Sequence, residues 1–307
     1  MRQSTPSRRT VLRAGGALGV AAVAGCLGDG APSTGDASPA DHAPAGSAFL
    51  LHAEVSTLLN DDQLRSRTNE FLQASGGQLP AGAQDVTGTL DNIESSTGLD
   101  PRALQEVTVF SGYEPDSPSG VRLEAGWAEA DLREALAGDG QATTETYNGR
   151  TVYALAGTTK LAVLDENTYV LGTAAGVEGA IDVAAGDADP ASGRVRDALA
   201  TAPDGPLRFG FVSPPDLGEG DSAGTLDPQT LGAITHGYGA YVVDGDSRSG
   251  SVTLETDAAE AASTIAAQLR TAKDMALRNL EQSTATPELA AEVEALLTSI
   301  DVTADGS

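Results

Sequence analysis

Two hairpin signals, close together in the middle of the chain, constrain the fold more than any other feature of the sequence. In the first, Asn148-Gly149 separates two alternating segments, and both positions tolerate the positive φ angles of a two-residue turn. In the second, Asp165-Glu166-Asn167 separates two apolar segments and fits a three-residue turn with Asn167 in the left-handed conformation. Because such turns join antiparallel strands, the chain must build an antiparallel sheet.

The rest of the chain alternates strands with amphipathic helices. Strands are predicted at 47–55, 106–112, 120–127, 143–147, 150–155, 160–164, 168–172, 207–212, 238–243 and 251–256. Helices are predicted at 61–74, 85–96, 129–137, 174–185, 191–201, 257–280 and 287–300, where apolar residues recur at helical spacing. Gly98 and Gly186 are placed to end two of them. The predicted class is α+β, with one or more antiparallel sheets of strand pairs and hairpins and with helices packed on one face.

The order strand, long excursion, strand pair and helix occurs twice, at 47–137 and at 207–280. The second strand and helix of each unit are comparable, GVRLEAGWAEADLREAL in one and GSVTLETDAAEAASTIA in the other. One interpretation is an internal duplication with sub-repeats at 47–140 and 206–300. The other is chance, because strand–helix alternation is common.

The N-terminal region of the chain has the arrangement of basic, apolar and small residues that is typical of an export signal. Arg8 and Arg9 lie in a basic segment, twelve uncharged residues follow at 14–25, and the last of these are small. The paired arginines resemble a twin-arginine signal, which implies that the twin-arginine export machinery is a partner. A twelve-residue helix would span about 18 Å, too little for a hydrocarbon core of about 30 Å. Residues 1–25 are therefore predicted to be a removable signal.

Cys26, the only cysteine of the chain, follows this segment directly. Val23-Ala24-Gly25-Cys26 resembles the lipobox of exported lipoproteins, which implies cleavage before Cys26 and a lipid on its sulfur. The alternative is an ordinary secretory signal before an incidental cysteine. The next residues are mainly Gly, Ala, Pro, Ser, Thr and Asp, too polar to fold alone. We predict a disordered, lipid-anchored linker at 26–46 and a globular domain at 47–300, on the extracellular face of the cytoplasmic membrane.

Charge excludes one class of partner. The chain has 44 acidic and 18 basic residues, and four of the basic ones lie within the predicted signal, so the mature net charge is near −30. Such a chain repels nucleic acid and anionic surfaces, and salt screens its self-repulsion. Lys160 and Lys273 are the only lysines. This acid-rich, lysine-poor composition resembles that of halophilic proteins.

Two motifs suggest chemistry, and their surroundings argue against it. Gly220-Asp221-Ser222-Ala223-Gly224 matches the nucleophile elbow of serine hydrolases, with Asp227 and His236 following in chain order. Its flanks are rich in Gly and Pro, which favours a surface loop. Asp244-Gly245-Asp246 with Glu255 matches part of a calcium loop, but the predicted flanking strands favour a hairpin turn. The sequence therefore predicts no catalytic, cofactor or metal site.

Four segments carry a resemblance to a known group. GLDPRALQEVTVFSG, ETYNGRTVYAL, LAVLDENTYVLGT and AAGVEGAIDVAAG are similar to segments of haloarchaeal twin-arginine-exported lipoproteins of unknown function. They also resemble a wider group of uncharacterised exported proteins with the same order of strand pairs and helices. The resemblance covers about residues 47–260 and implies no catalytic residues.

Three functions are compatible with these features. The predicted one is a non-catalytic, lipid-anchored surface protein that binds a small molecule or an envelope protein. One alternative is an extracellular hydrolase that uses carboxylates or Ser222. The other is the solute-binding subunit of an importer. Acidic residues in a deep pocket would favour a hydrolase, and a helix-covered sheet without such a pocket would favour binding.

The lipid anchor can be tested by mass spectrometry of the purified protein. We expect residues 1–25 to be missing and a lipid to be attached to Cys26, and Cys26→Ser should accumulate as precursor or be released. Replacing Arg8 and Arg9 by lysine should block export. An unmodified thiol on Cys26 of the mature protein would contradict the anchor, and normal secretion of the lysine variant would contradict the twin-arginine route.

Overall fold

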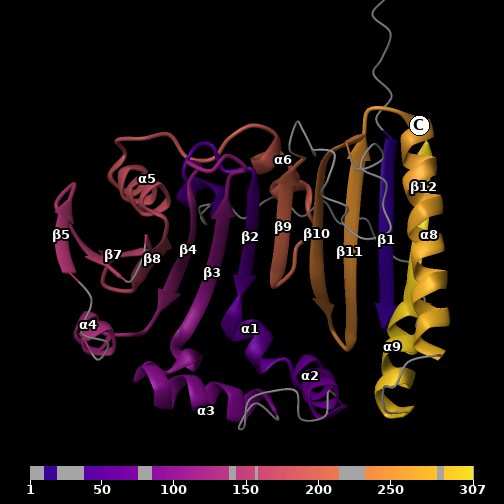
Figure 1. The fold of residues 1–307 in the computed structure, drawn as a ribbon, viewed down its shortest axis with the longest axis horizontal. Helices are drawn as coiled ribbons and strands as arrows, with labels where there is room; N and C mark the ends of the chain where they lie inside the picture. The colour runs from indigo at the N-terminus through magenta and orange to yellow at the C-terminus, as the bar shows by residue number, and fades with distance from the viewer. Residues whose placement is uncertain are drawn as a thin grey trace, which may run out of the picture.

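The structure of the protein, a computed structural model, describes residues 10–18, 38–74, 85–137, 143–155, 158–213, 232–281 and 287–306 (Figure 1). Within them, twelve strands form one sheet in the order β12-β1-β11-β10-β9-β2-β3-β4-β8-β7-β6-β5, with antiparallel neighbours throughout. The strands are β1 Thr10–Leu18, β2 Phe49–Glu54, β3 Leu104–Ser111, β4 Ser119–Ala125, β5 Thr143–Tyr147, β6 Arg150–Ala154, β7 Lys160–Asp165, β8 Thr168–Gly172, β9 Leu207–Val212, β10 Ile234–Asp244, β11 Ser247–Thr256 and β12 Ile300–Gly306.

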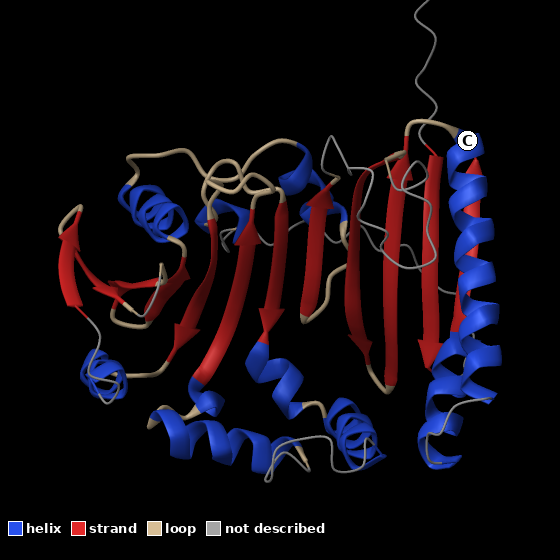
Figure 2. Cartoon of the chain, viewed as in Figure 1, coloured by secondary structure: helices blue, strands red, loops and turns tan. Residues whose placement is uncertain are grey.

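Helices surround this sheet (Figure 2). They are α1 Val55–Asn60, α2 Asp62–Ala74, α3 Val86–Thr97, α4 Glu129–Ala137, α5 Ala174–Ala185, α6 Arg194–Thr201, α8 Ala259–Glu281 and α9 Pro287–Ser299, with short 3-10 turns η1 Pro39–His42 and η2 Pro101–Ala103. Gly98 and Gly186 end α3 and α5 in the left-handed conformation, as predicted. The predicted α+β class with an antiparallel sheet is confirmed.

One of the two predicted hairpin turns is confirmed and the other is wrong in detail. Asn148 and Gly149 have φ angles of 44° and 74°. Asn167 is not left-handed, because Asn148 is the one non-glycine residue with positive φ in the part of the chain that the structure describes. The Asp165 carboxylate instead accepts the Asn167 N–H at 3.1 Å, and a register shift between Val163 and Asp165 accommodates the extra residue.

The predicted disordered linker at 26–46 is wrong at its end, because Pro39–His42 form η1 and both Ala40 and Ala43 are fully buried in the core with Leu50. Several other boundaries differ from the prediction. The chain after β2 forms the unpredicted helix α1, and α6 begins only after Gly193, which has a φ of 68°. Helix α8 begins at Ala259, two residues later than expected. Strands β10 and β11 are longer than predicted because they form one long hairpin around Gly245.

Strands β1 and β12 were not predicted. Strand β1 consists of residues from the predicted export signal and pairs with both β11 and β12. Strand β12 is also bound by α8, because Arg270 Nε and Nη2 donate to Val302 O at 3.0 and 2.7 Å and Lys273 Nζ donates to Ile300 O. If residues 1–25 are removed as predicted, β12 therefore keeps its attachment to α8.

The described helices lie on both faces of the sheet, α5 and α6 on one face and α4 and α8 on the other. Helices α5 and α6 cover a core that includes Leu50, Phe110 and Ile181. By strand alternation, Leu123 and Leu254 lie on the opposite face, where they belong to the cores under α4 and α8, respectively.

The two proposed sub-repeats occupy equivalent places. In each, three consecutive strands are neighbours, β2-β3-β4 in one and β9-β10-β11 in the other, and the first strands of the two units pair with each other. Each unit is followed by a helix on the same face, α4 or α8. A duplicated unit would produce this arrangement, and duplication remains a prediction.

We predict that Gly210→Val destabilises the fold by about 1–3 kcal/mol through overpacking. A Cβ at Gly210 would lie 2.5 Å from the Leu199 backbone nitrogen, so α6 could not stay against β9. Gly250→Val is the control, because a Cβ there meets nothing within 4 Å, and we expect a change within about 0.5 kcal/mol. Urea unfolding of both variants measures the difference, and equal losses would contradict the tight contact of α6.

Candidate functional site

The middle of the sheet has an apolar face that none of the helices in the described ranges covers. Gly210 of β9 faces α6, so Phe209 and Phe211 lie on the other side of the strand. Register places Leu51 beside Phe209, Val109 beside Leu51 and Val121 beside Val109. We call this surface the open face; its residues, all partly exposed, are Phe49, Leu51, Val107, Val109, Val121, Leu207 and Phe209. At its margins, Leu123 packs against the core under α4 and Phe211 against the core under α8.

On β2 and β3, polar side chains on the α6 side are more buried than apolar side chains on the open face. His52 and Thr108, which lie on the α6 side, are 6% and 3% exposed. Leu51 and Val109, on the open face of the same strands, are more exposed than these polar residues. Both faces of these two strands are thus suited to burial, but among the helices that the structure describes only α5 and α6 form a layer over them, on one face, which leaves the open face available to a ligand.

Two phenylalanines extend the open face across β10. A Cβ added to Gly239 would lie 2.6 Å from the Phe209 ring, and one added to Gly237 would lie 2.7 Å from the Phe211 ring. The two rings therefore lie over the glycine backbone of the neighbouring strand. This arrangement gives a smooth apolar floor that a side chain on β10 would interrupt.

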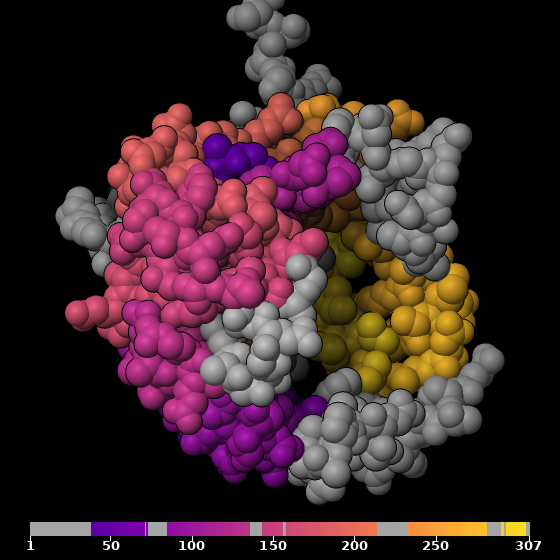
Figure 3. All heavy atoms as spheres, turned by 60° about the vertical axis from the view of Figure 1, so that its left-hand side comes forward, coloured from indigo at the N-terminus to yellow at the C-terminus, as the bar shows by residue number. Residues whose placement is uncertain are grey.

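Helices enclose the open face on three sides. Helix α4 and strands β5–β8 lie beyond one edge, and α8 and α9 lie beyond the other. Helices α1, α2 and α3 cross one end of the strands and form what we call the end helices (Figure 2). Figure 3 shows the molecule hollowed between the α4 side, in magenta and pink, and the α8–α9 side, in gold. The open face is therefore recessed.

A nearly buried ion pair joins the end helices to the β10–β11 hairpin. Arg248 Nε donates to Asp61 Oδ2 at 2.6 Å and its Nη2 to Oδ1 at 3.2 Å, while Tyr241 OH lies 3.4 Å from Oδ2. The side chains of Arg248 and Asp61 are 14% and 4% exposed. The hydrogen bond from Arg248 holds the pKa of Asp61 below its usual range, so the pair stays ionised at neutral and mildly acidic pH.

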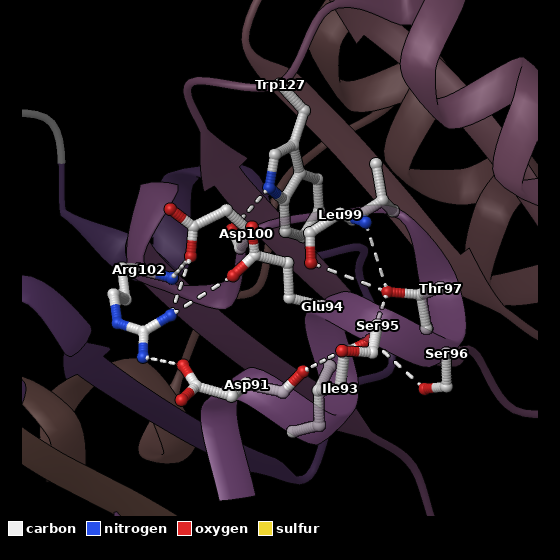
Figure 4. Close-up of polar contacts among 10 residues, drawn as sticks. All are labelled: Asp91, Ile93, Glu94, Ser95, Ser96, Thr97, Leu99, Asp100, Arg102 and Trp127. Carbon is white, nitrogen blue, oxygen red and sulfur yellow. Dashed lines mark hydrogen bonds and ion pairs between the residues drawn. The ribbon is translucent and has the colours of Figure 1, made fainter. Parts of the chain in front are cut away.

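At the other end of this layer, Arg102 gathers three carboxylates (Figure 4). Its guanidinium contacts Asp91 and lies 3.3 Å from Glu94 and 3.4 Å from Asp100, which ties α3 to η2. Trp127 Nε1 donates to the Asp100 carbonyl at 2.8 Å and connects η2 to the end of β4. These ion pairs are exposed, so each contributes little and their value lies in positioning α3.

On the α6 side, a row of polar residues crosses the same strands. Register aligns Arg122, Thr108, His52 and Arg208 on β4, β3, β2 and β9. His52 Nδ1 lies 3.4 Å from Thr108 Oγ1. Burial lowers the pKa of His52, and the nearby Arg208 lowers it further, so the ring is neutral at pH 7. The row is packed within the structure and offers no described hollow.

Most of the predicted site residues lie outside the described residues. These are Arg8, Arg9, Cys26, Ser222 and Asp227. His236 is described; its Nε2 lies 3.0 Å from Glu255 Oε2 and its Nδ1 3.0 Å from Thr235 Oγ1. Because both ring nitrogens have partners, this arrangement leaves none to activate a serine.

The calcium-like segment is a hairpin turn, as predicted. Strand β10 ends at Asp244, β11 begins at Ser247, and Gly245 between them has a φ of 54°. Across the described ranges, no group of three or more His, Cys, Asp or Glu side chains is placed to hold a metal ion. None of the helices in these ranges combines the length and apolar character needed to cross a membrane.

Two hollows share no lining residue with the open face. One, of about 480 Å³, lies along α8 beside Ser263, Ala267 and Thr271. The other, of about 460 Å³, lies near α4 beside Glu129, Arg150 and Asp165. The first is lined mainly by small side chains of one helix, and half of the residues that line the second are charged, so neither provides an extended apolar wall.

Comparison with known proteins does not identify a function. No family model matches the chain, and no curated protein matches its sequence. Solved structures of TP0453 are similar in part. Crystal form IV gives a TM-score of 0.42 at 10% identity over 75% of this chain and 97% of that one. Crystal form I gives 0.40 at 9% identity over 70% and 78%. TM-scores below 0.5 at such identity carry no functional argument.

We predict that His52→Gln reduces the loss of stability on acidification. The pKa of His52 is lower in the fold than its ordinary value of 6.5, so the unfolded chain binds its proton first and stability falls as pH drops below that value. Thermal midpoints at about pH 7.5 and 5.5, above the main carboxylate range, should differ less in the variant than in the wild type. An unchanged difference would contradict a neutral, buried His52.

Proposed function

We propose that this chain is an exported, lipid-anchored, non-catalytic protein that binds an elongated apolar small molecule on the open face of its sheet. The observation that carries the proposal is the open face itself, seven partly exposed apolar residues on four adjacent strands. A surface of this kind is costly to leave in water and is common at binding sites.

The recess favours a small molecule over a protein partner. Two helical walls and the end helices surround the open face (Figure 3), so a flat protein surface could not reach the strands. A narrow apolar molecule could lie along the row formed by Phe209, Leu51, Val109 and Val121. Concave apolar surfaces enclosed by the fold are typical of small-molecule sites.

Charge limits the ligand further. The open face carries no ionisable side chain on β9, β2, β3 or β4, so it supplies neither a general acid nor a counter-ion. The chain as a whole is strongly acidic, with a formal charge of −26. A ligand with an anionic head group would therefore be disfavoured at low salt, and a neutral apolar molecule fits best.

The cellular location of the protein, outside the cytoplasmic membrane, is part of the same proposal. The sequence from Arg8 to Cys26 supports export and attachment of a lipid to Cys26. The Gly-, Ala- and Pro-rich residues after Cys26 would then separate the domain from the membrane surface. In this position the open face could take up an apolar molecule outside the cell.

Binding can be measured with N-phenyl-1-naphthylamine, a neutral apolar probe whose fluorescence rises out of water. The full chain with Cys26→Ser avoids detergent. We expect saturable binding, and Leu51→Asn should weaken it about tenfold, or about 1.4 kcal/mol, because it places an amide in the middle of the apolar row.

The matched control is Leu296→Asn, because Leu296 of α9 is 52% exposed and is not one of the open-face residues. It should bind the probe like the parent. Thermal midpoints show that both variants are folded. Absence of saturable binding, or equal affinity in the Leu51 and Leu296 variants, would refute the site.

A further inference from the structure

The end helices have little core of their own. Neither α1 nor α3 contains a buried residue, and Ile93 of α3 is 43% exposed. Helix α5, by contrast, buries Gly176, Val177, Ala180 and Ile181 against the sheet. Segments with few buried apolar contacts open locally at lower free energy than the core does. The end helices are thus suited to movement while the sheet stays folded.

Polar contacts hold this layer, and they differ at its two ends. Both ends are continuous with the sheet, α1 directly from β2 and α3 through η2 into β3, and the α3 end is further held by the Arg102 and Trp127 contacts. The junction of α1 and α2 is held to the β10–β11 hairpin by Asp61–Arg248 and by Gln63 Nε2, which donates to Asp246 O at 3.3 Å. Asp61 and Arg248 are separated by 187 positions in the sequence, so this contact closes the layer across the sheet.

We infer that the Asp61–Arg248 pair is a latch, and that its opening lets α1 and α2 move away from the hairpin and admits the apolar ligand to the open face. This inference rests on the proposed function and adds its regulation. Tyr241 and Arg248 both lie on the open-face side of the hairpin, as alternation from Gly239 and from Leu254 shows. The latch is thus at the rim of the site it would control.

Arg248 is the better residue to change. Asp61 also accepts the backbone N–H groups of Gln63 and Leu64 at 3.0 and 3.1 Å, so its replacement would damage the start of α2 as well. Arg248→Met keeps much of the side-chain stem and removes the charge and the donors. The control is Arg67→Met, which breaks the exposed pair with Glu70 on the same helix α2.

Hydrogen exchange tests the latch without a ligand. In Arg248→Met, we expect amides in 55–72 to exchange about tenfold faster, with exchange in α5 unchanged. Arg67→Met should exchange like the parent in both regions. Unchanged exchange in 55–72 would overturn the latch. Equal acceleration in α5 would also overturn it, because the pair would then stabilise the whole fold instead of one layer.

Probe kinetics test the gate. Mixing the Cys26→Ser chain with N-phenyl-1-naphthylamine in a stopped-flow instrument should show a severalfold higher association rate when Arg248→Met is added. Faster exchange in 55–72 with an unchanged association rate would overturn the gate. If the parent binds no probe, the proposed function fails and the gate with it, whereas the exchange experiment still decides whether the pair holds the end helices.

Discussion

The structure depends on an imbalance in how its central strands are covered. Strands β2, β3 and β9 carry apolar side chains on both faces, β4 carries them on the open face alone, and α5 and α6 cover the opposite face. The open face is enclosed only at its edges, by α4, α8 and the end helices. Because the hydrophobic effect favours removing such a surface from water, the recessed shape and the proposed ligand both follow from this imbalance.

The few cations of this acidic chain are placed at its junctions. Arg248 joins the end helices to a hairpin, Arg102 draws three carboxylates together, and Lys160 bridges Glu145 and Glu178. In a chain with 44 acids, each such residue cancels repulsion as well as forming a bond. The nearly buried pair at Arg248 is the least screened by salt, so it can act in conditions where the exposed pairs are weak.

Local signals in the sequence predicted local structure well. Asn148-Gly149 specified its turn because both residues accept positive φ, and Gly98 and Gly186 ended their helices for the same reason. Asn167 was mispredicted because the Asp165 side chain satisfies the turn in another way. Strand β12 was missed because it depends on pairing with β1 and on α8, and neither contact is visible in a short segment.

The candidate site was only partly visible in the sequence. The run FLLHA shows apolar residues at successive positions, which indicates a strand with two apolar faces, and LRFGF alternates apolar residues with Arg208 and Gly210. Nothing in them tells which face the helices will cover. The Asp61–Arg248 contact could not be predicted, because the two residues are far apart in the chain and only the fold brings them together.

The surroundings of Trp127 have a practical consequence. Trp127 is the only tryptophan of the chain, its ring lies 5.9 Å from the Tyr169 ring, and it donates to the Asp100 carbonyl at the start of η2. Its fluorescence therefore reports on the position of the end helices against the sheet.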